Sequence, residues 1–188
     1  VTTRSGPTAP SSGVRLVQLD EQRLLDEAQR RTRLDDFGDP SFREPFGRLL
    51  RSFETEANLT FLGRAAARQD VLRLLTHRLR MVADRRRRPE IGGQEIRAPL
   101  FVTGLPRTGT TLLHGLLAQD PANRAALNWE MMFPSPPPAR ARYQRDRRIE
   151  LAERQIRWFH RLAPDFQKIH PVGARLPEEC LIVHSHSF

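Results

Sequence analysis

The chain has 188 residues, of which 38% are hydrophobic and 28% charged, a composition typical of one globular domain with a real core. No apolar run is long enough to span a bilayer, and residues 1–13 lack the apolar stretch of a signal peptide. The single cysteine, Cys180, excludes an internal disulfide and a cysteine-based zinc cluster. We therefore expect a cytoplasmic protein without a bound metal.

The formal net charge of +9 would ordinarily suggest a nucleic-acid partner. Lys168 is the only lysine, however, and abundant arginine, alanine and proline are what a GC-rich coding sequence produces whatever the function. The run of arginines from Arg85 to Arg88 precedes Pro89, which is typical of a solvated helix end. Since no recognition-helix, zinc-finger or RNP pattern accompanies the charge, we expect no nucleic-acid partner.

The amino-terminal half is predicted to be helical. Residues 1–13 read as a flexible tail, and residues 14–98 as a helical region with helices from Asp20 to Leu34, from Ser41 onward and from Gly63 to Arg85. Apolar residues recur at helical spacing on these segments, which predicts that they form the core: Leu24, Leu25, Ala28, Phe42, Phe46, Leu49, Leu50, Phe53, Val71, Leu72, Leu75, Leu79 and Val82.

Residues 99–188 are predicted to form a partial α/β core. After a linker from Pro89 to Ala98, Phe101 and Val102 suit a strand buried on both faces. A helix from Thr111 to Ala118 and a brief strand from Ala125 to Leu127 follow, the latter with Asn128, Trp129 and Glu130 at its end. Further along the chain we expect irregular structure over 134–138, an arginine-rich helix over 139–162, and a last segment capped by Glu178 and Glu179.

The loop between the first strand and its helix carries the strongest signal. Gly104 and Gly109 bracket four residues as in a Walker A loop, but Thr110 stands where that motif has lysine, and Arg107 is the only cation within the loop. Glycine permits the sharp turn and the positive φ with which backbone N–H groups converge on an anion at a helix N-terminus. The predicted anion-binding residues are Gly104, Pro106, Arg107, Thr108, Gly109, Thr110 and Thr111.

The run GLPRTGTTLLH from Gly104 to His114 resembles the 5′-phosphosulfate loop of sulfotransferases that use 3′-phosphoadenosine 5′-phosphosulfate (PAPS). It is closest to a bacterial branch with the PRTGTT wording and is similar in this loop to tyrosylprotein sulfotransferases. The segments LDDFGDP from Leu34, WEMMFPSPPP from Trp129 and LAPDF from Leu162 also resemble that bacterial branch.

The resemblance implies a P-loop NTPase-like α/β sulfotransferase fold and transfer of a sulfuryl group from PAPS to a hydroxyl acceptor, without a metal. The acceptor would be a small molecule, a lipid or a glycan, for which Phe42, Phe46, Trp129 and Phe133 could line an apolar pocket. Arg107 would stabilise the charge that develops on the leaving phosphate. The family's downstream arginine and serine, which grip the 3′-phosphate, have no counterpart here, so we expect a truncated form with little or no activity of its own.

The catalytic base is the open assignment. Glu130 lies near the position of the catalytic glutamate of the tyrosylprotein branch, although about two residues further from the loop, and it could equally be a helix-capping or arginine-paired glutamate. His114 is a second candidate, one turn into the loop helix, and His170, His184 and His186 are further histidines without a metal-ligand pattern. Two other functions remain open: a P-loop kinase or NTPase, and an arginine-rich nucleic-acid-binding or scaffolding helical protein.

Overall fold

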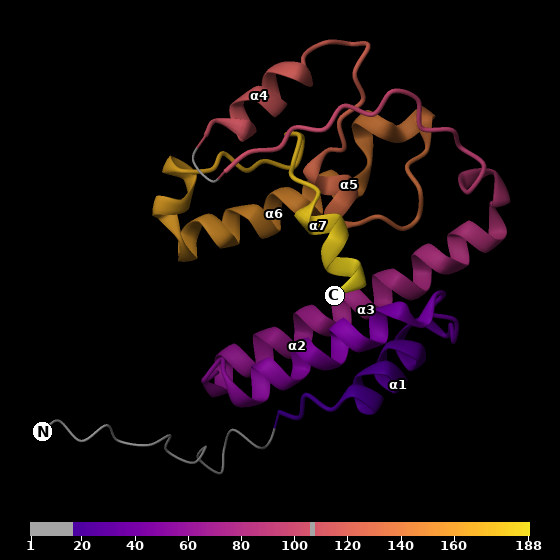
Figure 1. Cartoon of the computed structure of the whole chain (residues 1–188), viewed down its shortest axis with the longest axis vertical. Helices are drawn as coiled ribbons and strands as arrows, with labels where there is room; N and C mark the ends of the chain where they lie inside the picture. The colour runs from indigo at the N-terminus through magenta and orange to yellow at the C-terminus, as the bar shows by residue number, and fades with distance from the viewer. Residues whose placement is uncertain (1–16, 106–107) are drawn as a thin grey trace, which may run out of the picture. The chain divides into compact units, whose positions relative to one another are not determined.

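The computed structural model describes residues 17–105 and 108–188 (Figure 1). The chain divides into two compact units, one of residues 1–79 with 187–188 and the other of residues 80–186. Regular structure in the described ranges is helical: α1 Glu21–Thr32, α2 Arg43–Thr55, α3 Phe61–Arg87, α4 Thr110–Leu117, α5 Asn128–Met132, α6 Arg147–Leu162 and α7 Leu181–His184. Short 3₁₀ turns join them: η2 Pro40–Phe42, η3 Pro89–Ile91, η4 Arg140–Arg145, η5 Pro164–Lys168 and η6 Ser185–Ser187.

Helix α1 forms as the sequence predicts. The Asp20 carboxylate accepts a hydrogen bond from the backbone N–H of Arg23 at 2.9 Å, which satisfies one of the donors left open at the helix start. The helix ends at Arg33, whose φ of 57° is left-handed. Leu24, Leu25 and Ala28 are buried, so the predicted apolar face of this helix is confirmed.

The second helix was predicted from Ser41 onward, with Ser41 as its N-cap, but it starts differently in the structure. Asp39 accepts from the backbone N–H of Ser41 at 2.7 Å and opens the 3₁₀ turn η2, after which α2 runs from Arg43. The capping residue is therefore aspartate, because its carboxylate can reach the N–H two residues on while Pro40 presets the turn. The same backbone hydrogen bond from Ser41 holds the pKa of Asp39 below its ordinary value.

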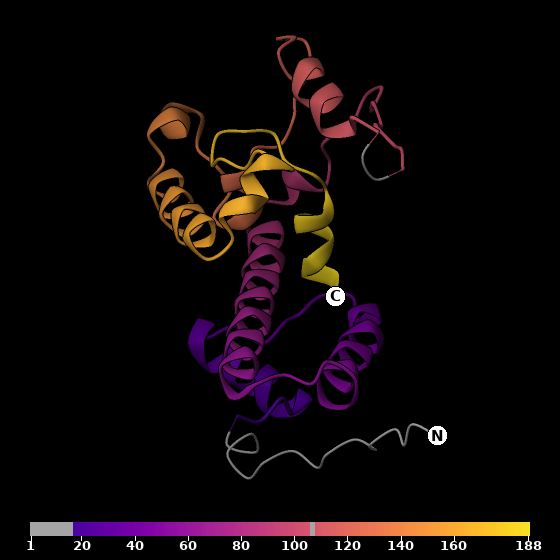
Figure 2. The ribbon, with the colours of Figure 1, turned by 90° about the vertical axis from the view of Figure 1, so that its left-hand side faces the viewer.

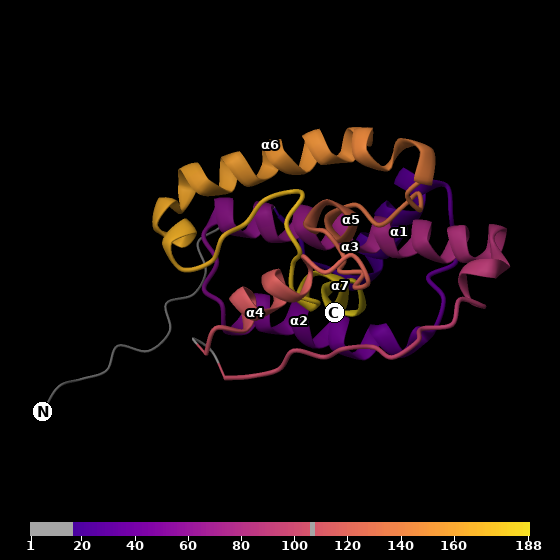
Figure 3. The ribbon, with the colours of Figure 1, turned by 90° about the horizontal axis from the view of Figure 1, so that it is seen from above.

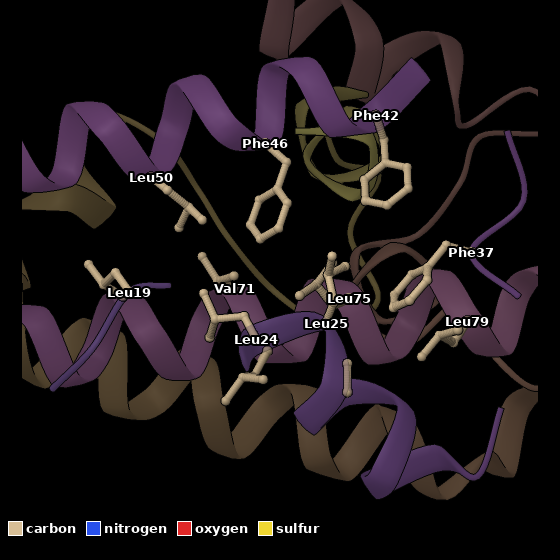
Figure 4. Packing of buried hydrophobic residues seen from close by; sticks show 12 residues of the cluster. Leu19, Leu24, Leu25, Phe37, Phe42, Phe46, Leu50, Val71, Leu75 and Leu79 are labelled. Atoms are coloured by element: carbon tan, nitrogen blue, oxygen red, sulfur yellow. The ribbon is translucent and has the colours of Figure 1, made fainter. Parts of the chain in front are cut away.

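The core of the first unit lies between α1, α2 and the part of α3 from Val71 to Leu79 (Figure 4). Phe42 stacks between Phe37 and Phe46, with ring centroids 5.7 and 6.4 Å away, and Phe188 packs on Phe46 at 4.7 Å. Because Phe42 and Phe46 are only 2% and 0% exposed, they fill this core and do not line an acceptor pocket, which corrects that expectation. Val82, also predicted to be core, is only partly buried.

The second unit is built around Trp129 on α5. Trp129 is fully buried and packs with the apolar face of α6, which contributes Ile149, Ala152 and Ile156. In Figures 2 and 3, α4 and α6 lie on different sides of this unit, with α5 and the chain leading to α7 between them. The arginine-rich helix predicted over 139–162 is interrupted at Asp146, whose carboxylate accepts from the backbone N–H of Arg148 at 2.9 Å and starts α6 anew.

The predicted strands are absent from the described residues, which are helical where they are regular, so the expected α/β secondary structure is corrected there. Phe101 is 82% exposed, and residues 99–105 pair with no strand. The expected strand over 125–127 is reduced to one antiparallel bridge between Leu127 and Pro177, and Asn128, Trp129 and Glu130 begin α5 instead. A strand needs a neighbour for its backbone N–H and C=O groups, and the described ranges supply none to Phe101.

Within residues 17–105 and 108–188, no helix has both the length and the apolar character needed to cross a membrane.

Two leucines on α3 allow a matched test of the first unit's core. Leu75 is fully buried and Leu62 is 77% exposed. We expect Leu75→Ala to lower the free energy of unfolding by about 2–5 kcal/mol, because it removes buried methyl groups and leaves a cavity. Leu62→Ala should change it by less than about 0.5 kcal/mol. Urea unfolding followed by far-UV circular dichroism measures both, and equal losses would contradict the packing described.

Candidate functional site

The loop that follows residue 103 folds back closely on itself. A Cβ placed on Gly104 would lie 2.7 Å from Thr108 Oγ1 and 2.9 Å from Thr110 Cγ2, closer than real Cβ atoms approach. Gly109 has a φ of 87°, a backbone conformation that side chains other than glycine rarely adopt. Both glycines are therefore required by the loop geometry, and the positive φ predicted for Gly109 is confirmed.

The loop leads directly into α4. Gly109 is the N-cap of this helix and provides no side-chain cap, so the first-turn N–H groups are left without a side-chain partner. Thr108 donates its hydroxyl to the carbonyl of Leu105 at 2.7 Å, which ties the loop to itself. Open N–H groups and the positive end of a helix dipole together favour an anion here. Pro106 and Arg107, two of the predicted anion-binding residues, lie outside the described residues.

A carboxylate lies beside this helix start that the sequence did not assign to the site. The hydroxyl of Thr111 donates to Glu179 Oε1 at 3.4 Å, across 68 positions of the chain. Glu178 and Glu179 were expected to cap the last segment, but the N-cap of α7 is Cys180 and makes no side-chain capping bond. The adjacent glutamates after Pro177 were the only sequence signal, and nothing local in them points to the loop.

Backbone hydrogen bonds explain how Glu179 reaches this position. Trp129 N–H donates to the carbonyl of Ala174 at 3.0 Å, Asn128 N–H to that of Leu176 at 3.0 Å, and Glu178 N–H to that of Ala126 at 3.3 Å. These bonds run the chain over 174–178 antiparallel to residues 126–129. Glu179 is the next residue after the pairing, and it is exposed.

Glu130, the sequence candidate for the base, is enclosed by donors. Its Oε1 accepts from Arg124 at 2.6 Å and its Oε2 from the backbone N–H of Leu127 at 2.8 Å, and Tyr143 also hydrogen-bonds to it. The Glu130 side chain is only 10% exposed. It thus caps α5 from the N3 position and pairs with an arginine, the two structural roles that the sequence left open beside a catalytic one.

An open cavity of about 460 Å³ adjoins this glutamate, lined by Arg124, Glu130, Pro138, Arg140, Tyr143 and Gln144. Burial raises the pKa of the Tyr143 hydroxyl, and its hydrogen bond to Glu130 and the negative charge of that carboxylate raise it further, while Arg124 acts in the opposite direction. The wall of the cavity thus carries a glutamate, a tyrosine and two arginines.

The histidines are placed separately. His114 lies on α4, partly buried, one turn after the start of the helix. His170 pairs with Glu178 at 3.1 Å, and His186 is buried with Nδ1 3.0 Å from the carbonyl of Ile182. Within the described ranges no three histidine, cysteine, aspartate or glutamate side chains gather in a way that could hold a metal ion.

Comparison with known proteins identifies a family that matches the part of the chain containing this loop. Residues 99–188 match the family described as "Sulfotransferase family". Among solved structures, sulfotransferase STF1 from Mycobacterium tuberculosis H37Rv matches with 33% identity and a TM-score of 0.75 over 89% of this chain and 47% of its own. Sulfotransferase STF9 from Mycobacterium avium matches with 28% identity and a TM-score of 0.76 over 89% of this chain and 43% of its own. No curated protein sequence matches the chain.

Residues 99–188 therefore match the sulfotransferase family, as the resemblance in the loop implied. The chain spans less than half the length of the two solved structures that it matches.

The chain contains one tyrosine, so absorbance at 295 nm during an alkaline titration reports on Tyr143 alone. We expect its midpoint above the ordinary tyrosine value of about 10, since burial and Glu130 disfavour the phenolate. Glu130→Gln removes a negative charge beside the phenolate and should lower the midpoint. Glu150→Gln, an exposed change of the same kind on α6, should leave it unaltered. An unchanged midpoint in Glu130→Gln would contradict the contact between Tyr143 and Glu130.

Proposed function

We propose that this chain carries the donor-binding part of a PAPS-dependent sulfotransferase, which transfers a sulfuryl group to a hydroxyl of a small molecule, a lipid or a glycan. The observation that carries the proposal is the turn at Gly104, where even a Cβ would collide with Thr108 and Thr110, followed by the uncapped start of α4. This close turn beside open N–H groups is suited to a phosphosulfate.

Different residues of the loop would bind the donor and stabilise the leaving phosphate. The first-turn N–H groups of α4 and the hydroxyls of Thr110 and Thr111 would bind the 5′-phosphate end of the donor. Arg107 would lie at the bridging oxygen, where negative charge grows as the bond to sulfur breaks. A guanidinium suits that role because it stays charged and offers several N–H donors to phosphate or sulfate oxygens.

Transfer requires one bond to form and one to break. The acceptor oxygen forms the new S–O bond, while the electrons of the old S–O bond remain on the phosphate of 3′-phosphoadenosine 5′-phosphate (PAP). The proton of the acceptor hydroxyl must pass to a base, for which Glu130 and His114 are the candidates from the sequence. No metal is needed to bridge two phosphates, in contrast to a kinase.

Binding of PAP tests the function directly. We expect calorimetry to show that the chain binds PAP in preference to Mg-ATP, and that Arg107→Ala weakens PAP binding roughly 10- to 100-fold, the effect of one lost charge-assisted contact. Arg142→Ala, on the exposed η4 turn of the same unit, is the matched control and should bind as the unaltered chain does. Preference for Mg-ATP would favour a kinase or NTPase. Salt-steep binding of DNA or RNA, indifferent to Arg107, would favour a nucleic-acid-binding protein.

Two glycines near the loop, Gly104 and Gly115, do not have a positive φ, so replacement by alanine tests only the space around their Cβ. Gly104→Ala should weaken PAP binding at least about tenfold, because the added Cβ forces Thr108 and Thr110 out of place. Gly115→Ala, on α4 with no atom within 4 Å of its Cβ, should leave PAP binding unchanged and stabilise the helix by up to about 1 kcal/mol. The measurements are calorimetry and thermal unfolding; equal PAP affinity in both variants would count against the loop as the donor site.

A further inference from the structure

Three carboxylates lie near the paired segments of the second unit, and they differ in their hydrogen-bond and ion-pair partners. Glu130 accepts from Arg124, from the backbone of Leu127 and from Tyr143. Glu178 accepts from the N–H of Glu179 at 2.9 Å and pairs with His170. In the part of the chain that the structure describes, the Glu179 carboxylate has one partner, the hydroxyl of Thr111.

The carboxylate with the fewest partners is also the one at the loop. Thr111 belongs to the first turn of α4, the helix start at which the donor's phosphate would bind. Its contact with Glu179 is long for a hydrogen bond at 3.4 Å, so an incoming ligand displaces it at little cost. The described residues of the loop make no hydrogen bond or ion pair with Glu130.

We propose that Glu179 is the general base of sulfuryl transfer in this protein; the assignment rests on the proposed function. As the acceptor oxygen bonds to sulfur, its proton moves to the Glu179 carboxylate, and the S–O bond to the phosphate breaks with its electrons left on PAP. The transfer ends with a protonated Glu179 beside PAP. A base must be within hydrogen-bond reach of the acceptor hydroxyl. The contact with Thr111 places Glu179 next to the helix start at which the donor would bind, and so within a side chain's length of the transferring group.

Glu130 is less suited to accept this proton. Each of its oxygens already accepts a hydrogen bond, so protonation would weaken the stabilising contacts from Arg124, Leu127 and Tyr143. Those bonds also cap α5, which carries Trp129 into the core. Glu179 can take a proton without breaking any structural hydrogen bond beyond the weak one from Thr111.

The assignment has a consequence that needs no turnover to be seen. PAP brings a phosphate charge next to Glu179, and a like charge nearby favours the protonated form of a carboxyl group. Binding of PAP should therefore favour the protonated form of Glu179, which is the state that transfer leaves behind. Other groups near the site, such as His170 on Glu178, contribute equally in the chain and in a Glu179 variant, so their contribution cancels in the difference.

Calorimetry of PAP binding at pH 6.5, in two buffers with different heats of ionisation, measures this proton uptake. We expect Glu179→Gln to bind PAP several-fold more tightly and to take up fewer protons on binding than the unaltered chain, since a charge that repels the phosphate is gone. Glu150→Gln, an exposed glutamate on α6, is the control of equal charge change and should match the unaltered chain. Glu130→Gln should keep the proton uptake, because Glu130 is not the acceptor.

The other outcomes are equally informative. Loss of the uptake in Glu130→Gln but not in Glu179→Gln would overturn the assignment in favour of Glu130. Uptake and affinity unchanged in Glu179→Gln, with normal PAP binding, would overturn it while leaving the proposed function intact. Failure of the unaltered chain to bind PAP would overturn the proposed function and this assignment with it.

Discussion

The antiparallel pairing of residues 126–129 with residues 174–178 is the interaction on which the second unit depends. Its three backbone hydrogen bonds join chain segments almost 50 positions apart and hold Trp129 over the apolar face of α6. Asn128, Trp129 and Ala174 are buried, and pairing their backbone groups removes a penalty that buried, unpaired N–H and C=O groups would impose. The same pairing delivers Glu179 to the start of α4, so one set of bonds serves both the core and the site.

The loop at Gly104 depends on a steric constraint more than on attraction. The tight turn forms because two positions lack side chains: Gly104, where a Cβ would meet Thr108 and Thr110, and Gly109, where φ is positive. The hydroxyl of Thr108 is used within the loop, and that of Thr111 donates to Glu179, which leaves the helix N–H groups and the hydroxyl of Thr110 for an anion. The match of residues 99–188 to the sulfotransferase family gives this arrangement a chemical context.

Helices were predictable where the information is local. The cap at Asp20 and the apolar spacing of Leu24, Leu25 and Ala28 predicted α1, because a helix is decided by contacts within a few residues. The strand at Phe101 was predicted from its apolar run and is absent from the described residues, since a strand is decided by a partner that its own sequence does not contain. The break at Asp146 shows the same limit within a helix: an aspartate can lie on a helix surface or cap a new one.

The sequence by itself determined the chemistry of the loop, because the glycines, the threonines and Arg107 occur within eight consecutive residues and are read without knowledge of the fold. It also determined the family, which the comparisons confirm. Only the tertiary structure decided which acidic side chain lies beside that loop. Glu130 and Glu179 look alike in the sequence, but Arg124, Leu127 and Tyr143 enclose the first with donors. The pairing of distant segments brings the second, exposed, beside Thr111. That difference depends on contacts across 68 positions, which no local pattern encodes.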